Sequence, residues 1–207
     1  MHGSRTGELL LLTGPMFAGK SSSLIAHART HGDDVLVIKP AFDTRDGASM
    51  ISSRDRSRIA ALPVSSWPAQ AAPHTALVID EVQFMVAPHY TGDIVADIRA
   101  AVDAGAQVVV GGLDTDYMRR PFDVIVRLSA FAHRRVALSA RCHVCAAPAA
   151  WTAKKNETGR RLELGDDDLY EARCDLHWTP PASAPASATP TAPARVAVPA
   201  SAGLDRA

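Results

Sequence analysis

The chain has 207 residues, of which 47% are hydrophobic, and its 22 Lys and Arg residues are balanced by 22 Asp and Glu residues. That length and apolar content suffice for one α/β domain with an accessory module, whereas the balanced charge argues against a broad cationic surface for nucleic acid or anionic lipid. No apolar run approaches the ~20 residues that cross a bilayer, and residues 1–8 are too polar for a secretory signal, so we expect a cytoplasmic protein that does not bind membranes.

The first motif along the chain is a phosphate-binding loop. Residues 14–21 fit G-x-x-x-x-G-K-[ST] and directly follow the apolar run 9–12. A strand over 8–13 and a helix over about 20–31 would direct loop N–H groups and the positive helix end toward an anion. A plain strand–turn–helix is the alternative. The motif predicts ATP or GTP at Gly14, Pro15, Met16, Phe17, Ala18, Gly19, Lys20 and Ser21, with the Ser21 hydroxyl on Mg²⁺.

A second strand is predicted at 35–38, a β-branched run closed by Pro40. Asp43-Thr44-Arg45 follows it, where open α/β sheets present ligand-binding loops. Asp43 is suited to assist a metal or a nucleophile, and Arg45 to contact phosphate. A solvated loop with a local ion pair fits the local sequence equally well. Residues 49–75 suggest no chemistry.

Two acidic residues follow the next predicted strand. The apolar run 76–79 ends in Asp80-Glu81, which is how a buried strand delivers acids to its exposed end. Asp80 is suited to hold Mg²⁺, through water, and Glu81 to accept a proton from an attacking hydroxyl or water. Two neighbouring acids on a surface turn are the alternative, which the preceding apolar run disfavours.

The next segments continue the alternation of helix and strand. A helix is predicted over 88–104, starting after Pro88, and a buried strand over 108–110 leads into the loop 111–117. A helical crossover over 122–133 precedes a strand at 136–138. This order predicts an α/β fold of the P-loop NTPase type, with a mostly parallel sheet flanked by helices, over residues 1–138.

The composition changes at Cys142. Cys142-x-x-Cys145 and Cys174-x-x-His177, separated by 28 residues, supply the four ligands of a tetrahedral structural Zn²⁺. Unligated cysteines with an incidental histidine are the alternative. We therefore expect a zinc-binding module over 139–178 whose two ligand pairs fix the base of a polar loop. Residues 179–207 are rich in Ala, Pro and Ser and predict a disordered tail.

The order of these motifs resembles the zinc-containing type II (thymidine kinase 1-like) thymidine kinases over about residues 8–178. The resemblance implies transfer of the ATP γ-phosphate to the 5′-hydroxyl of thymidine or deoxyuridine with Mg²⁺, a homotetramer inhibited by thymidine triphosphate, and a place in pyrimidine salvage for DNA synthesis. It implies that Glu81 is the base and that the loop between the zinc ligands is a lasso covering the substrate. It implies nucleoside contacts from Met16, Phe84, Leu113, Tyr117, Phe122, Thr152 and Tyr170, and from Leu162, Glu163 and Leu164 in the lasso.

Some positions differ from the usual family pattern. Ala18 is often Ser in the family, Tyr117 is often Phe, and Gly165 precedes three Asp residues where a glycine pair is expected. These differences leave the nucleoside preference open, so a kinase for another nucleoside or a nucleotide is one alternative. A P-loop zinc-ribbon ATPase that binds nucleic acid is another, which the local balance of charges in the zinc module disfavours.

Overall fold

A computed structural model describes residues 7–45, 47–72, 75–156 and 164–180 of the chain. Its described residues form a central sheet of six strands in the order β5-β2-β6-β7-β1-β8, and each neighbouring pair is parallel. The strands of this sheet are β1 (Glu8–Thr13), β2 (Val35–Pro40), β5 (Leu62–Val64), β6 (Ala76–Ile79), β7 (Gln107–Gly112) and β8 (Arg134–Ala137). The sheet confirms the predicted α/β class.

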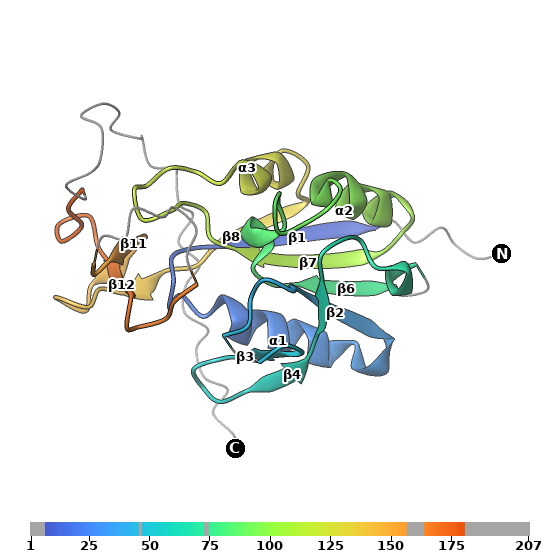
Figure 1. Ribbon diagram of the computed structural model, residues 1–207, viewed down its shortest axis with the longest axis horizontal. Helices are drawn as coiled ribbons and strands as arrows, with labels where there is room; N and C mark the ends of the chain where they lie inside the picture. Colours follow the sequence, from blue (N-terminus) through green and yellow to red (C-terminus); the bar gives the residue numbers. More distant parts are fainter. Residues whose placement is uncertain (1–6, 46, 73–74, 157–163, 181–207) are drawn as a thin grey trace, which may run out of the picture.

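Helices cover both faces of the sheet, as Figure 1 shows. The helix α1 (Lys20–Thr30) lies on one face, and α2 (Ile94–Asp103) and α3 (Asp123–Ser129) lie on the other. Short 3-10 helices connect the elements at η1 (Gly32–Asp34), η2 (Ala69–Ala71) and η3 (Val82–Phe84).

The apolar residues of β1 pack into the hydrophobic cores on both faces of the sheet. Successive side chains of a strand point to opposite faces. Leu9 and Leu11 therefore pack with the residues of α2 and α3, while Leu10 and Leu12 pack with those of α1. Burial on both faces is typical of a central strand in a parallel sheet, and it fixes the position of the loop that follows β1.

Several boundaries differ from the sequence prediction. The second covering helix begins at Ile94 rather than after Pro88, because the Asp93 side chain accepts a hydrogen bond from the Val95 N–H (3.0 Å) and caps the helix there. The third crossover is helical only from 123 to 129, and the last strand of the sheet begins at Arg134, because the Leu9 carbonyl and β1 backbone pair with this segment.

The segment 49–75 contains structure that the sequence did not suggest. A hairpin of β3 (Met50–Ser52) and β4 (Arg58–Ala60) lies against α1, and β5 adds a parallel strand at the edge of the sheet beside β2. Pro63 is tolerated in β5 because an edge strand need not donate every backbone hydrogen bond.

The region after β8 consists of two small antiparallel sheets. They pair β9 (Ala140–Arg141) with β10 (Pro148–Ala149) and β11 (Trp151–Lys154) with β12 (Tyr170–Arg173). Their buried side chains pack against Phe17 and Ala18 of the phosphate loop. Of the predicted tail over 179–207, residues 181–207 lie outside the described residues. Among the described helices, none combines the length and apolarity that spanning a membrane requires.

Candidate active site

The phosphate loop is held by its two glycines and by the core below it. Gly14 has φ 144°, and a Cβ there would lie 2.4 Å from the Leu138 carbonyl oxygen, so only glycine fits. Gly19, with φ 81°, lies immediately before α1 and in the left-handed region that glycine adopts readily. The loop therefore leads from β1 into the N-terminus of α1 along a pocket of about 1150 Å³, part of it open to solvent.

Lys20 and Ser21 enter that pocket from the first turn of α1. The buried Lys20 ammonium donates to the carbonyl oxygens of Gly14 (3.0 Å) and Pro15 (2.7 Å). Burial lowers the pKa of Lys20, against the opposing effect of the acids at 80 and 81. The Lys20 ammonium thus lies against the loop, where the oxygen atoms of a bound phosphate would replace the two carbonyl oxygens as its partners.

Asp80 stands at the end of β6, beside Ser21. The Ser21 hydroxyl donates to Asp80 Oδ2 (3.0 Å), and the Glu81 N–H donates to Asp80 Oδ1 (2.8 Å). Burial, with the neighbouring Glu81 charge, raises the pKa of Asp80 to about 7. A divalent cation beside Asp80 would stabilise the ionised carboxylate, which burial otherwise keeps protonated near neutral pH. A hydroxyl beside a carboxylate is a donor set that suits Mg²⁺.

Glu81 has a left-handed backbone (φ 51°) and a carboxylate with both oxygens engaged. Arg45 Nη2 donates to Oε1 (2.7 Å), and the Gln83 amide donates to Oε2. Strained backbone of this kind is retained where the surroundings fix it, often at functional sites. The two donors hold the carboxylate in one position.

Arg45 links Glu81 to the other predicted acid, Asp43. Its Nε donates to Asp43 Oδ1 (2.8 Å) and its Nη2 to Asp43 Oδ2 (3.0 Å), while Nη1 reaches the Gly165 carbonyl oxygen (3.4 Å). Burial would raise the pKa of Asp43, but the hydrogen bonds and charge of Arg45 outweigh it and the pKa lies below its usual value. Burial likewise opposes the charge of Glu81 and the contacts of Asp43 at Arg45, whose pKa is raised.

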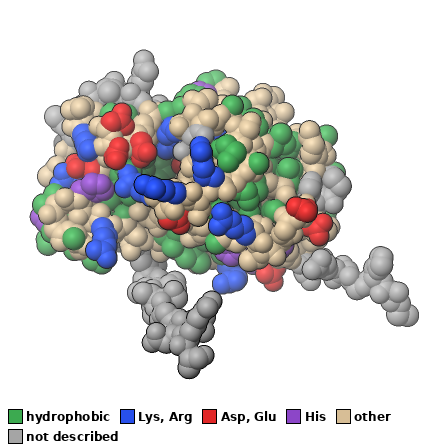
Figure 2. All heavy atoms as spheres, turned by 90° about the horizontal axis from the view of Figure 1, so that it is seen from below, with side chains coloured by type: hydrophobic (Ala, Val, Ile, Leu, Met, Phe, Trp, Pro, Cys, Tyr) green, Lys and Arg blue, Asp and Glu red, His purple; other side chains and the backbone are tan. Residues whose placement is uncertain are grey.

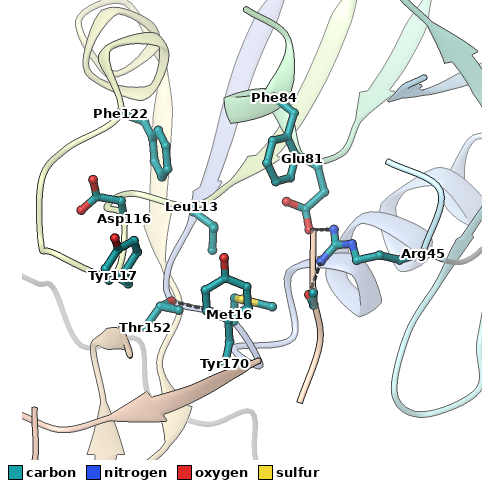
Figure 3. Close-up of a pocket in the computed structure, with 11 residues that line it drawn as sticks. Met16, Arg45, Glu81, Phe84, Leu113, Asp116, Tyr117, Phe122, Thr152 and Tyr170 are labelled. Atoms are coloured by element: carbon teal, nitrogen blue, oxygen red, sulfur yellow. Dashed lines mark hydrogen bonds and ion pairs between the residues drawn. The ribbon is translucent and has the colours of Figure 1, made fainter. Parts of the chain in front are cut away.

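A second, narrower pocket of about 420 Å³, part of it open to solvent, adjoins the phosphate pocket (Figure 3). Met16, Arg45 and Glu81 line both pockets, so the Glu81 carboxylate stands where they meet. Figure 3 shows Glu81 and Phe84 entering from one side and Tyr117 and Thr152 from the opposite side. The residues lining the second pocket are Met16, Arg45, Glu81, Phe84, Leu113, Asp116, Tyr117, Phe122, Thr152, Gly165 and Tyr170.

The second pocket brings together most of the residues assigned to the nucleoside from the resemblance. Seven of them line it, contributed by the phosphate loop, η3, the loop after β7, and the strands β11 and β12. Leu162 and Glu163 lie outside the described residues. Leu164 is described and half-buried, but it does not line the pocket, whereas its neighbour Gly165 does.

Sequence reasoning missed Asp116 and Lys39. Asp116 is buried in the second pocket's wall, where its Oδ1 accepts the N–H groups of Met118 (2.9 Å) and Arg120 (2.8 Å). An Asp within a short polar loop is a signal for such a turn. Lys39, in β2 and 1% exposed, donates to the carbonyl oxygens of Gly47 (3.2 Å) and Met50 (2.9 Å), which no local pattern indicates.

The region after β8 is tied to the loops around the pockets. The Met16 N–H donates to the Thr152 hydroxyl (3.0 Å), which joins the phosphate loop to β11. The guanidinium of Arg119 lies between the rings of Trp151 and Trp178, 3.9 Å from each centroid. These contacts join the loops of the sheet domain to the region after β8, and both contribute to the walls of the second pocket.

The cysteines and His177 form a cluster suited to a metal ion. One ligand atom from each of the four residues lies within 4.8 Å of every other. The sulfur atoms of Cys145 and Cys174 are 3.8 Å apart, and Zn–S bonds of about 2.3 Å at tetrahedral angles place two sulfurs about 3.8 Å apart.

The protonation of Cys142 also suits a metal ligand. Burial would raise the pKa of this thiol, but backbone hydrogen bonds of Cys174 and Cys145 outweigh it and lower the pKa to about 6. The thiolate is the form that binds a metal ion. Three sulfurs and one imidazole are a donor set that suits zinc.

Comparison with known proteins gives consistent matches. A family model described as thymidine kinase matches residues 7–178. A thymidine kinase of Mesomycoplasma hyopneumoniae (strain 7448) is 36% identical over 176 residues, covering 81% of this chain and 93% of that protein. A thymidine kinase of Pyrobaculum aerophilum is 31% identical over 189 residues, covering 84% of this chain and 99% of that protein. A solved structure of Bacteroides Pif1 bound to ssDNA aligns over 60% of this chain and 33% of its own, at 20% identity and a TM-score of 0.33, a level that carries no argument.

Proposed function

The chain belongs to the thymidine kinase family, and we infer that it transfers the γ-phosphate of ATP to the 5′-hydroxyl of thymidine or deoxyuridine. The products are ADP and the nucleoside 5′-monophosphate. The observation that carries this function is the position of Glu81, which lines the phosphate pocket and the narrower pocket together. A group at that junction is placed to act between a triphosphate and a nucleoside.

Glu81 is the proposed general base. Its carboxylate, held by Arg45 and Gln83, would accept the 5′-hydroxyl proton as that oxygen bonds to the γ-phosphorus. The bond between the γ-phosphorus and the bridging oxygen then breaks, and ADP leaves with the electron pair. Phosphoryl transfer asks the protein mainly for positioning and charge stabilisation, so fixing this carboxylate is a large part of its task.

The phosphate loop, residues 14–21, is the proposed triphosphate site. Lys20 would exchange the Gly14 and Pro15 carbonyl oxygens for phosphate oxygens, a small movement because the ammonium already lies inside the loop. Asp43 would act through Arg45, by orienting its guanidinium toward Glu81. Arg45 was expected at the phosphate and lines the phosphate pocket, and its contacts with both acids support this positioning role as well.

Ser21 and Asp80 are the proposed Mg²⁺ ligands, with water between Asp80 and the ion. Bound Mg²⁺ would neutralise charge on the phosphate oxygens during transfer. The support is the buried Asp80 carboxyl group and its 3.0 Å contact with the Ser21 hydroxyl.

We propose that zinc at the Cys142, Cys145, Cys174 and His177 cluster is structural, because protein atoms fill all four positions. The ion would anchor the base of the lasso that covers the nucleoside. The proposed division of the chain is a nucleotide-binding domain over 1–138, a zinc-binding lasso module over 139–178 and a tail over 179–207.

Assembly and setting are further parts of the proposal. We propose a homotetramer in the cytoplasm that serves pyrimidine salvage and supplies DNA synthesis, and membership of the family supports each of these. Light scattering of the purified protein tests the assembly, since a mass near one or two chains would overturn the tetramer.

A panel of nucleosides tests the function. Incubation with ATP, Mg²⁺ and each nucleoside should give a monophosphate from thymidine and deoxyuridine, and much less from the other nucleosides. Phosphorylation of a different nucleoside would show that the acceptor differs from the one proposed, while the reaction is still phosphoryl transfer from ATP. ATP hydrolysis without any phosphorylated nucleoside would overturn the kinase.

The same panel separates this function from a nucleic-acid-binding ATPase. Nucleic-acid sites gather Lys and Arg on one face, whereas Figure 2 shows both signs interspersed on the face that it presents. Tight, salt-sensitive binding of single strands in a gel-shift titration would favour the ATPase.

A further inference from the structure

The β3–β4 hairpin carries a cation that has no role in the proposed function so far. Arg54 lies in the turn of this hairpin, and its side chain lines the same pocket as Lys20 and Ser21. Its guanidinium lies 4.0 Å from the centroid of the Phe17 ring, and Phe17 belongs to the phosphate loop. The hairpin therefore places a positive charge at the rim of the loop.

The other cationic side chains of the pocket already have hydrogen-bond partners within the protein. Lys20 donates to two loop carbonyl oxygens, and Arg45 is engaged by Asp43 and Glu81. Lys39 is fully buried against backbone carbonyl oxygens. A triphosphate in this pocket would thus meet three cations that must first give up or share a partner.

Arg54 is held more weakly. Its Nη2 lies 3.7 Å from Asp166 Oδ1 and 3.7 Å from Asp167 Oδ2, and the side chains of all three residues are more than half exposed. Pairs at this distance and exposure contribute little, ~0–1 kcal/mol. Arg54 can therefore exchange these partners at low cost.

We propose that Arg54 binds the polyphosphate of ATP and that Asp166 and Asp167 compete with ATP for it. The proposal rests on the proposed function and deepens it by adding a substrate-binding residue. The two acids occupy Arg54 in place of phosphate oxygens, and stacking on Phe17 keeps the guanidinium at the loop during the exchange. Because Asp166 also lines the pocket, the exchange takes place inside the site.

The competing explanation is that these contacts only attach the hairpin to the segment carrying the two acids. The two explanations differ in whether the two variants change ATP affinity in the same direction or in opposite directions. Under simple attachment, Arg54→Gln and the double variant Asp166→Asn/Asp167→Asn break the same contact and change ATP affinity in the same direction. Under competition, the arginine variant weakens ATP binding and the double variant strengthens it.

The experiment measures the Kd of ATP, ADP and AMP by isothermal titration calorimetry on the full chain. We expect Arg54→Gln to raise the Kd of ATP about tenfold, which corresponds to about 1.4 kcal/mol, with a smaller change for ADP and the smallest for AMP. Arg54→Lys should recover part of the loss, because it keeps the charge without the planar fork. The double variant should lower the Kd of ATP two- to threefold.

Arg56→Gln is the matched control, since it removes the same charge from the same turn while Arg56 is absent from the described lining of the pocket. It should change the Kd of ATP less than twofold. Equal effects of Arg54→Gln and Arg56→Gln, shifts in the same direction for Arg54→Gln and the double variant, or no change would overturn the inference. Failure of the wild-type protein to phosphorylate thymidine would overturn the proposed function alone, because ATP binding is measured independently.

Discussion

Replacing Glu81 with Gln perturbs three groups at once. The substitution preserves size but turns one of the two carboxylate oxygens into an NH₂ donor. In the structure one oxygen accepts from Arg45 and the other from the Gln83 amide. Whichever way the new amide is oriented, a donor faces a donor, so the variant loses both the base and the fixed position of its side chain.

The expected loss is large and falls on kcat. Removing a general base costs about 10²- to 10⁴-fold in rate, which is about 3–5 kcal/mol at 1.36 kcal/mol for each factor of ten. The unpaired donor adds ~1–3 kcal/mol, which the site can relieve only by moving the side chains apart. We expect kcat for thymidine to fall at least a hundredfold, while ATP still binds, because the loop at 14–21 is unchanged.

The assay follows formation of thymidine monophosphate at saturating thymidine and ATP, with ATP affinity measured separately by calorimetry. Glu8→Gln, which makes the same chemical change at an exposed position at the start of β1, is the control and should retain wild-type rates. Thermal unfolding of both variants shows whether they remain folded. A folded Glu81→Gln protein with more than a tenth of the wild-type kcat would refute the role of Glu81 as base.

Three further substitutions test the other parts of the site. Cys145→Ser should lower the zinc content measured by atomic absorption and raise the KM for thymidine more than the KM for ATP, because the proposed ion would anchor the lasso on the nucleoside side. Equal losses would indicate general unfolding. Gly112→Ala would place a Cβ 2.9 Å from Gln83 Oε1 and 2.8 Å from Ile125 Cδ1, so the melting temperature should fall, with ~1–3 kcal/mol lost, and kcat should fall with it; an unchanged melting temperature and kcat would contradict the packing. Arg119→Ala should lose the stacking on two tryptophan rings, ~1–3 kcal/mol, seen in thermal unfolding and tryptophan fluorescence, whereas unchanged curves would show that the contact contributes nothing.

The sequence predicted those parts of the fold that depend on neighbouring residues. The strand, loop and helix around residues 8–30 follow from an apolar run, two glycines and a helix-forming segment, all local features. The sequence does carry the signal for the start of α2, because Asp93 precedes Ile94 and caps the helix, but the prediction of a helix starting after Pro88 overlooks it. The hairpin 50–60 was missed because its strands are only three residues long, too short for an alternating pattern.

The contacts that organise the candidate site join residues far apart in the chain. Arg45 and Glu81 are 36 positions apart, and Arg54 and Asp166 are farther apart still. A single sequence shows the charges but not which of them meet. The place of Arg45 after a strand suggests a phosphate contact but gives no sign of the two carboxylates, Asp43 and Glu81, that it contacts in the structure.

The protein partners of these charged groups show which contacts a bound nucleotide has to replace. Lys20 is satisfied by carbonyl oxygens, the Ser21 hydroxyl by Asp80 and Arg54 by two exposed acids, so each group already has a substitute for a phosphate or metal ligand. A buried polar group without a partner costs more than the pairing is worth, so the buried Lys20 and Asp80 need such partners, whereas the more than half-exposed Arg54 is held only weakly by its two acids. ATP affinity is consequently a difference between two sets of contacts. It follows that weakening a substitute, as at the acids facing Arg54, should tighten ATP binding without adding any contact to ATP.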